Sequence, residues 1–325
     1  MIKQNIGSYV PRSVHDQNIH NFAVLENALG CSPKIKTLTL PLHEYPGVEI
    51  IKLKSKIANW LRITPDMIVL GAGSDDLINL IPQVFLEPEE KVFVKIPTFF
   101  RILEAIHKVR GRLINTPDHA KLVWLCNPNN PTGEITNIKI NPDQLTIVDE
   151  AYQEICDPKN EKSTLNLLPK NKNLLITKTF SKAFGLAGIR VGFAVGHPEI
   201  INILNRWQTN FPISSVSAQI AQMALDNLDF LSFVHGHFAR EREFIFDELS
   251  NLNNIEHSQS QTNVFIARHK KAKLFNLLLK ENILTADFDQ ANGLENKGFV
   301  RITIKQHKEN ALLVNALKKA NSVII

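Results

Sequence analysis

Short β-rich runs alternate with helical apolar patterns from about Asp66 to Gly196, and this alternation constrains the fold more than any other feature. It is typical of an α/β protein in which helices cover a parallel sheet. Helical spacing is clearest over Asp75–Phe85 and Phe99–Val109. The candidate strands are Met67–Leu70, Lys91–Lys95, Lys121–Cys126, Leu145–Asp149, Leu174–Lys178 and Val191–Val195.

The pattern changes after Gly196, where three helices are predicted in succession over His197–Trp207, Val216–Leu225 and Phe230–Leu249. A compact strand–helix–strand–helix pattern follows over Asn263–Ala267, Lys271–Glu281, Phe299–Ile304 and Lys308–Lys319. This predicts a smaller α/β unit with its own core. The predicted organisation is a large domain over residues 40–228 and a small domain made of residues 1–39 and 229–325.

Composition excludes several classes of function. A formal net charge of +5 is modest for 325 residues, and no basic cluster points to nucleic acid. The three scattered cysteines show no metal-ligand spacing and favour a reducing compartment. The start of the chain lacks the apolar run of a signal peptide, and no apolar stretch reaches the length of a membrane span. We therefore expect a cytoplasmic protein that binds neither nucleic acid nor a membrane.

The first motif that carries chemistry is Cys126-Asn127-Pro128-Asn129-Asn130-Pro131-Thr132-Gly133, directly after a candidate strand. Two X-Pro bonds and a glycine predict a rigid turn. The carboxyl edge of an open α/β sheet is where ligands bind. An asparagine held there can donate its amide to an anionic oxygen of a ligand.

The second motif is Asp149-Glu150-Ala151-Tyr152, at the end of the apolar run Leu145–Val148. An aspartate at a buried strand end can pair with a protonated pyridine nitrogen and keep an aromatic ring cationic. Tyr152 can share the ring oxygen with Asn130. Taken alone, an Asp-Glu pair in this position is more often a cap or a metal ligand.

The third motif, Lys178–Arg190, places Lys182 between hydroxyl residues in a loop of small residues. A lysine that forms a Schiff base with a cofactor aldehyde requires such surroundings, and Arg190 offers a fork for a phosphate. The turn Gly71-Ala72-Gly73-Ser74-Asp75 adds backbone amides that can bind an anion. A dinucleotide-binding interpretation of that turn is disfavoured because the third glycine and the later acidic residue are missing.

Together these motifs resemble the class I/II pyridoxal-phosphate (PLP) aminotransferases of fold type I, and within them the histidinol-phosphate aminotransferase branch. The resemblance extends from Tyr9-Val10-Pro11 to Arg301-Ile302-Thr303-Ile304. It implies an α/β fold with a large, mostly parallel central sheet and a smaller α/β domain. It also implies PLP as cofactor and a homodimer with shared active sites.

The resemblance assigns roles to individual residues. Lys182 would hold the cofactor and shuttle the proton, Asp149 would pair with the pyridine nitrogen, and Tyr152 with Asn130 would contact the ring oxygen. Arg301 would grip the substrate carboxylate, and Tyr9 and Leu29 would line the substrate pocket. The remaining cofactor-binding residues would stack on the ring or surround the phosphate: Phe99, Ser74, Asp75, Thr179, Ser181, Arg190 and, from the other subunit, Tyr45.

Two departures from the family pattern concern the substrate. Ala286 stands where the family usually has an arginine, and Leu29 stands where it has an aromatic residue. Lys305 is a candidate replacement cation, although a surface lysine is the commoner interpretation. Few residues separate Asn130 from Asp149, so the helix that usually lies between them must be very short or absent.

These features predict an aminotransferase of amino-acid metabolism. It would move an amino group between an L-amino acid, or an amino-alcohol phosphate such as histidinol phosphate, and a 2-oxo acid. The main alternative is a decarboxylase or lyase of the threonine-phosphate decarboxylase type, because it would use the same cofactor contacts. A non-catalytic cofactor-binding protein is disfavoured because Lys182 is present and no DNA-binding extension is visible.

Overall fold

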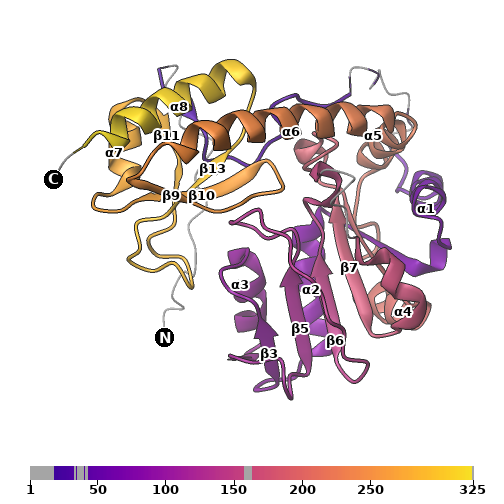
Figure 1. Cartoon of the computed structure of the whole chain (residues 1–325). Coiled ribbons are helices and arrows are strands. Elements are labelled where there is room, and N and C mark those ends of the chain that lie inside the picture. Colours follow the sequence, from indigo (N-terminus) through magenta and orange to yellow (C-terminus); the bar gives the residue numbers. More distant parts are fainter. Residues whose placement is uncertain (1–17, 33, 35–39, 41–42, 157–162, 324–325) are drawn as a thin grey trace.

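The computed structural model describes residues 18–32, 34, 40, 43–156 and 163–323. Tyr9 therefore lies outside the described residues. Figure 1 shows a central sheet with its covering helices, and a second layer of strands and helices reached through one long helix, α6 (Asp229–Ser250). Within the described residues, no helix has both the length and the apolar character that a membrane span requires.

The central sheet has seven strands in the order β2-β8-β7-β6-β5-β3-β4. All neighbouring pairs from β7 to β4 are parallel, whereas β8 runs antiparallel to both β7 and β2. The sheet is therefore mostly parallel, as predicted. Its strands are β2 (Ile68–Gly71), β3 (Lys91–Val94), β4 (Arg112–Ile114), β5 (Leu122–Cys126), β6 (Leu145–Asp149), β7 (Leu174–Thr179) and β8 (Gly192–Gly196).

Helices cover both faces of this sheet, and each face has its own core. The helices α2 (Ser74–Phe85), α3 (Phe100–Lys108) and α4 (Pro198–Trp207) pack on the face that carries Ile147 and Leu175. The helices α1 (Val48–Leu61), α5 (Ser215–Leu225) and α6 pack on the face that carries Val148 and Ile176. Because side chains alternate along a strand, both faces are apolar, and β2, β7 and β8 are buried throughout, whereas β3 and β4 each begin with an exposed residue.

The second sheet has four antiparallel strands in the order β12-β13-β10-β9. These are β9 (Ile255–His257), β10 (Val264–His269), β12 (Ala286–Asp287) and β13 (Val300–Thr303), accompanied by α7 (Leu274–Lys280) and α8 (His307–Asn321). Near the start of the described chain, β1 (His20–Asn21) pairs in parallel with β11 (Ile283–Leu284). The short 3-10 helices are η1 (Pro65–Met67), η2 (Gln153–Ile155), η4 (Thr164–Lys170) and η5 (Ala187–Ile189).

Most predicted elements agree with the structure to within one to three residues at each end. The predicted absence of a helix between Asn130 and Asp149 is confirmed, because this segment has only turns and extended chain. Sequence analysis did not identify α1, nor the short strands β1, β4, β9, β11 and β12. The expectation of parallel strands was wrong for β8, because an apolar run does not encode the direction of a strand.

Candidate active site

The predicted site lies where β6 and β7 end. Asp149 and Thr177 are paired across these strands, and the Thr177 hydroxyl donates to Asp149 Oδ1 at 3.2 Å. The next residue, Glu150, continues the ladder through its backbone N–H to the Thr177 carbonyl. Since neighbouring side chains of a strand point to opposite faces, Asp149 and Glu150 point away from each other. The charges of Asp149 and Lys182 act on each other's pKa, so the two side chains are close.

Lys182 is in the loop after β7. Its Nζ donates to the Leu25 carbonyl at 3.0 Å and lies 5.6 Å from the centre of the Tyr152 ring. Burial and then the positive charges of Arg301 and Arg190 together lower the pKa of Lys182 to about 8. With this pKa, about a tenth of the amine is unprotonated at pH 7, far more than for an exposed lysine, and a nucleophilic lysine requires the unprotonated form.

Asp149 is buried to 2% exposure between β5 and β7. Burial raises the pKa of its carboxyl to about 6, although the Ala151 N–H, the Thr177 hydroxyl and the charge of Lys182 oppose that rise. A cationic partner within reach would therefore restore the ionised form. Asp149 is suited to pair with a protonated ring nitrogen of a ligand.

Four of the residues predicted to bind phosphate come together beside Lys182. Thr179 and Gly71 are both paired with Gly192 of β8, so the end of β7 lies close to the start of α2 and Ser74. The Thr179 hydroxyl donates to Ser181 Oγ at 2.9 Å. The Arg190 guanidinium lies against Gly73, where an added Cβ would be 2.6 Å from Nη2. These groups form a cationic, hydroxyl-lined cradle at the N-terminus of α2.

Asp75 is part of the same turn, but its carboxylate faces elsewhere. Arg101 donates to it from Nε at 2.9 Å and from Nη2 at 3.2 Å. The carboxylate therefore braces α2 against α3. Any contact of Asp75 with a phosphate would come from its backbone N–H, which lies in the first turn of α2.

Arg301 and Asn130 meet across the two sheets. Arg301 Nη1 donates to Asn130 Oδ1 at 3.1 Å, and the guanidinium lies 5.1 Å from the centre of the Phe288 ring. The Asn130 turn is also tied to the turn before Phe99, because the Asn129 amide donates to the Pro97 carbonyl at 3.0 Å. The turns that carry Asn130 and Phe99, from separate strands of the central sheet, thus lie at one edge with Arg301 above them.

The segment Ala23–Gly30 covers this edge. The Asn27 amide donates to the Ala183 carbonyl at 3.0 Å, and an added Cβ at Gly185 would lie 1.8 Å from the Gly30 carbonyl oxygen. The carbonyls of Ala23 and Leu25 accept from Arg301 and Lys182 respectively. Leu29 is half-buried in this segment, and its backbone N–H donates to Asn27 Oδ1 at 3.0 Å.

Sequence analysis missed the contributions of Glu26 and Phe288 to this site. The charge of Glu26 raises the pKa of Lys182 against the larger lowering effects. Phe288 supports Arg301 through a cation–π contact. The sequence held a signal for Phe288: it lies two residues after Ala286, the position where the family usually has an arginine. In the structure Ala286 is paired with Arg301 in the second sheet.

The residues singled out for substrate choice are placed differently from one another. Ala286 and Ile266 flank Arg301 in the strand pairing, so its cross-strand neighbours on β12 and β10 are apolar. Lys305 is bound to Glu309 at 2.7 Å and lies 5.3 Å from the Phe22 ring centre. Tyr45 is 82% exposed and stacks on Phe211, with ring centres 5.0 Å apart.

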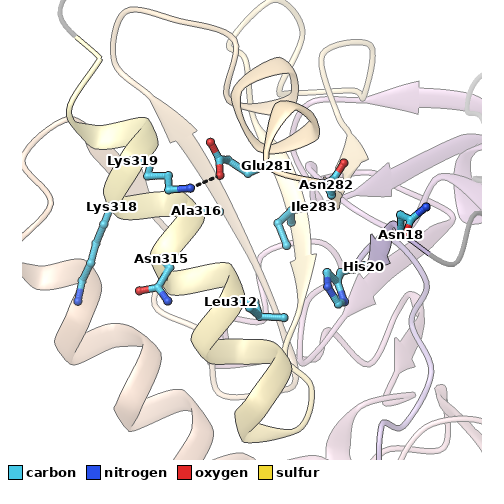
Figure 2. Close-up of a pocket in the computed structure, with 10 residues that line it drawn as sticks. All are labelled: Asn18, His20, Glu281, Asn282, Ile283, Leu312, Asn315, Ala316, Lys318 and Lys319. Atoms are coloured by element: carbon cyan, nitrogen blue, oxygen red, sulfur yellow. Dashed lines mark hydrogen bonds and ion pairs between the residues drawn. The ribbon is translucent and has the colours of Figure 1, made fainter.

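A cavity of about 550 Å3 lies apart from these residues, between α8 and the segments around β1 and β11 (Figure 2). Its lysines are paired: Lys319 with Glu281 at 2.5 Å and Lys318 with Glu248 at 2.6 Å. No predicted site residue lines it. The cavity therefore belongs to the second sheet and its helices, apart from the predicted site at the edge of the central sheet.

A mostly parallel sheet with a deprotonation-prone lysine, a buried carboxylate and an anion cradle at its edge defines an α/β enzyme that uses an aldehyde cofactor bearing a phosphate. The family model described as aminotransferase class I and II matches residues 18–317. The chain therefore belongs to the class I and II aminotransferases, and it is an enzyme that transfers amino groups with PLP as its cofactor.

Similar proteins agree with this family. The chain is 33% identical to a histidinol-phosphate aminotransferase of Staphylococcus saprophyticus over 92% of this chain and 90% of that one. It is 31% identical to histidinol-phosphate aminotransferase 2 of Bacillus cereus, with 92% and 88% covered. The crystal structure of histidinol-phosphate aminotransferase from Sinorhizobium meliloti in complex with PLP has a TM-score of 0.83 at 23% identity, with 93% and 90% covered.

The decarboxylase alternative is less well supported. L-threonine-O-3-phosphate decarboxylase from Porphyromonas gingivalis has a TM-score of 0.76 at 22% identity, and the match covers 85% of this chain and 93% of that one. This likeness shows a shared fold. The sequence relatives named above are aminotransferases.

The residues present fit PLP. Asp149 offers a buried carboxylate with a raised pKa, which a pyridinium nitrogen would satisfy. The Thr179, Ser181 and Arg190 groups offer donors for a phosphate. Lys182 lies near the Tyr152 ring, and the charges of both Asp149 and Arg190 act on its pKa.

Proposed function

We propose that Lys182 is the lysine that binds the cofactor aldehyde and moves the proton during amino transfer. The observation that most supports this proposal is the pKa of the amine, which burial and two arginines lower to about 8. The buried Asp149 carboxyl is close enough for its charge to act on the same amine. When bound, PLP supplies the ring that withdraws electrons from the substrate Cα. Lys182 supplies a base whose pKa is close to neutral pH, where general-base catalysis is efficient.

The other residues are proposed to bind and orient. Asp149 would hold the ring nitrogen protonated, and Asn130 with Tyr152 would donate to the ring oxygen. Arg301 would bind the substrate carboxylate through its two Nη groups, replacing its present contacts with Asn130 and Ala23. The phosphate would be bound by Ser74, the backbone N–H of Asp75, Thr179, Ser181 and Arg190, with Phe99 on the ring face and Tyr9 and Leu29 toward the substrate.

The proposed substrates are an L-amino acid and a 2-oxo acid. Because Ala286 and Ile266 flank Arg301, these two neighbours add no second charge beside it for a phosphorylated substrate. A carboxylate matches the single guanidinium fork. Histidinol phosphate, on which the named relatives act according to their names, is the substrate to test against ordinary amino acids.

The test mixes the PLP-loaded protein with single amino acids, with histidinol phosphate and with phosphothreonine, and analyses the products. Release of an oxo product with the amino group retained on the enzyme supports transamination and identifies the donor. Release of carbon dioxide with the original absorption spectrum restored would instead make the protein a decarboxylase. Lys182→Ala is the control for both outcomes.

The proposal includes a homodimer. Large apolar side chains are exposed in and just before α1: Tyr45 at 82%, Val48 at 58% and Ile51 at 67%. Trp207, the last residue of α4, and Phe211, between α4 and α5, are also exposed. Tyr45 would then reach the phosphate of the other subunit. Sedimentation of the wild type and of Ile51→Glu tests this, since a charge in the interface should shift the assembly to monomers.

Two further features are kept as proposals. Residues 40–228 would form the cofactor-binding domain, and residues 1–39 with 229–325 the second domain; the division is supported by the two sheets, which occupy separate stretches of the chain. A cytoplasmic location is supported by Cys31, Cys126 and Cys156, which are all free thiols. Limited proteolysis and fractionation of cells test these two proposals.

A further inference from the structure

Lys178 is a buried cation that the proposed chemistry does not use. It lies in β7 between Thr177 and Thr179, and its side chain is 2% exposed. Nζ lies 2.9 Å from Glu150 Oε2 and 2.6 Å from Glu154 Oε1. Burial alone would lower the pKa of Lys178, but the charges of Glu150 and Glu154 outweigh it and raise that pKa, so the lysine is charged.

The two carboxylates have different hydrogen-bonding partners. Glu150 is fully buried and also accepts from the Ser163 hydroxyl at 3.0 Å and from the Thr164 N–H and hydroxyl at 2.7 and 2.6 Å. Glu154 has Lys178 as its charged partner. One ammonium and two carboxylates leave a net charge of −1 in a buried cluster. Removing Lys178 would leave two unpaired carboxylates, which is costly in a protein interior.

The cluster is joined to the proposed site through the backbone. Glu150 follows Asp149 directly, and Glu150 and Glu154 lie on either side of Tyr152. The intervening turn is closed by the Gln153 N–H to the Glu150 carbonyl at 3.1 Å. His235 of α6 contacts the Glu154 carbonyl. Lys178 therefore ties both ends of the segment that carries Tyr152 to the strand that leads into the Lys182 loop.

We propose that Lys178 is a positioning residue: through Glu150 and Glu154 it fixes Asp149 and Tyr152 relative to Lys182, and its charge offsets the negative charge of Glu150 behind Asp149. This inference rests on the proposed roles of Asp149, Tyr152 and Lys182. Lys178 itself acts from the opposite face of the sheet, because it alternates with Thr177 and Thr179 on β7.

The electrostatic part follows from the groups around Asp149. The charge of Glu150 raises the pKa of Asp149, and the charge of Lys182 lowers it. The Cys126 thiol is also close enough for its own pKa to be raised, first by burial and then by the charge of Asp149. Changing the charge behind Glu150 should therefore change the titration of Asp149 before any cofactor is present.

The experiment compares Lys178→Met, Glu154→Gln and the double variant in the full-length protein. The pKa of Asp149 is measured by carboxyl-carbon NMR on cofactor-free protein, and kcat and KM are measured on PLP-loaded protein. Lys178→Met should raise the pKa of Asp149, because the charge of Glu150 is then no longer offset, and should lower kcat by about tenfold with a smaller change in KM. Glu154→Gln, which changes the charge in the opposite direction, should lower that pKa.

The double variant separates the two parts of the proposal. It carries the same net charge of −1 as the wild type, so the pKa of Asp149 should return to the wild-type value. The segment around Tyr152 is no longer tied to Lys178, so kcat should stay low. Lys178→Arg should restore both quantities, and Lys319→Met, which breaks an exposed pair with Glu281, should change neither.

The proposal would be overturned if Glu154→Gln left the titration of Asp149 at its wild-type value and the folded double variant kept the wild-type kcat. Glu154→Gln and the double variant decide the outcome even if Lys178→Met does not fold, because neither leaves two unpaired carboxylates. Failure of the site assignment is a separate result: it would appear as amino transfer that persists in Lys182→Ala, whereas the titration of Asp149 in cofactor-free protein does not depend on that assignment.

Discussion

Two lysines four residues apart, Lys178 in β7 and Lys182 in the loop after it, have pKa values shifted in opposite directions. Lys178 lies between two carboxylates, which raise its pKa. Lys182 is enclosed near Arg301 and Arg190, and its pKa is lowered to about 8. Burial pushes both pKa values down, so the sign of the nearby charges decides the outcome. The comparison shows how two buried lysines of one segment acquire pKa values shifted in opposite directions.

The largest effect on the contrast between the two lysines is expected for Lys182→Ala, which removes the amine proposed to bind the cofactor. We expect amino transfer to fall by at least about 10²- to 10⁴-fold, the usual contribution of a positioned base, with the cofactor no longer bound covalently. Absorption spectra and turnover with an amino-acid donor check this. Lys319→Ala, an exposed lysine with a similar ion pair, is the control and should keep full activity. Unchanged cofactor chemistry in Lys182→Ala would contradict the assignment.

A second variant, Asp149→Asn in cofactor-free protein, tests whether burial shifts the pKa of the carboxyl near Lys182 as described. The folded-state pKa of Asp149 is about 6 against an ordinary 3.8, so the folded state binds more protons between these values and loses stability as the pH rises through them. Relative to the wild type, the variant should gain up to about 3 kcal/mol in free energy of unfolding above pH 6. Urea unfolding at pH 4 and pH 7 measures this; an equal difference at both pH values would exclude it.

A third variant is Arg301→Gln, which removes the nearby charge that lowers the pKa of Lys182 most. Uptake of PLP by cofactor-free protein should then require a higher pH, because more of the amine is protonated. Loss of the fork should also reduce kcat/KM for carboxylate substrates by about 10- to 100-fold. Arg268→Gln, an arginine of the second sheet bound to Glu256, serves as the matched control. A shifted profile in the control would show that the effect is not specific to the site.

The smallest effect is expected for Phe288→Leu. This change keeps an apolar side chain but removes the ring that lies 5.1 Å from the Arg301 guanidinium. A cation–π contact of this kind is worth about 0.5–1 kcal/mol, so KM for the amino donor should rise by a few-fold with kcat unchanged. Steady-state kinetics with one donor suffice. A change confined to kcat would indicate that Phe288 acts on the reaction and not on Arg301.

The sequence predicted the elements that carry the site better than it predicted how they are connected. The strands ending at Asp149 and Thr179 were found because each is a buried apolar run followed by polar residues. The helix α1 was missed although Leu53 and Ile57 are fully buried. The antiparallel direction of β8 depends on which strands it meets in space, which a local pattern does not contain.

Within the site, the residues of the three motifs were predicted, but their partners were not. Asp75 was expected to face a phosphate and is bound to Arg101, a residue 26 positions away. The pairing of Lys178 with Glu150 and Glu154 was also missed. A signal was present, since a lysine inside the buried run Leu174–Thr179 requires a carboxylate partner. The alternation of side chains along a strand puts Lys178 on the other face of the sheet from Thr177 and Thr179. Which carboxylates lie beside it on that face could be learned only from the fold.

The close approach of Gly185 to Gly30 has a consequence for the order in which the protein folds. The covering segment and the lysine loop are joined by contacts such as Asn27 to Ala183, 156 positions apart, and Ala23 to Arg301, 278 positions apart. Contacts that close such long loops are slow to form. We therefore expect the strands of the central sheet to assemble first and catalytic competence to appear only in the last kinetic phase of folding, after the C-terminal strands have been synthesised.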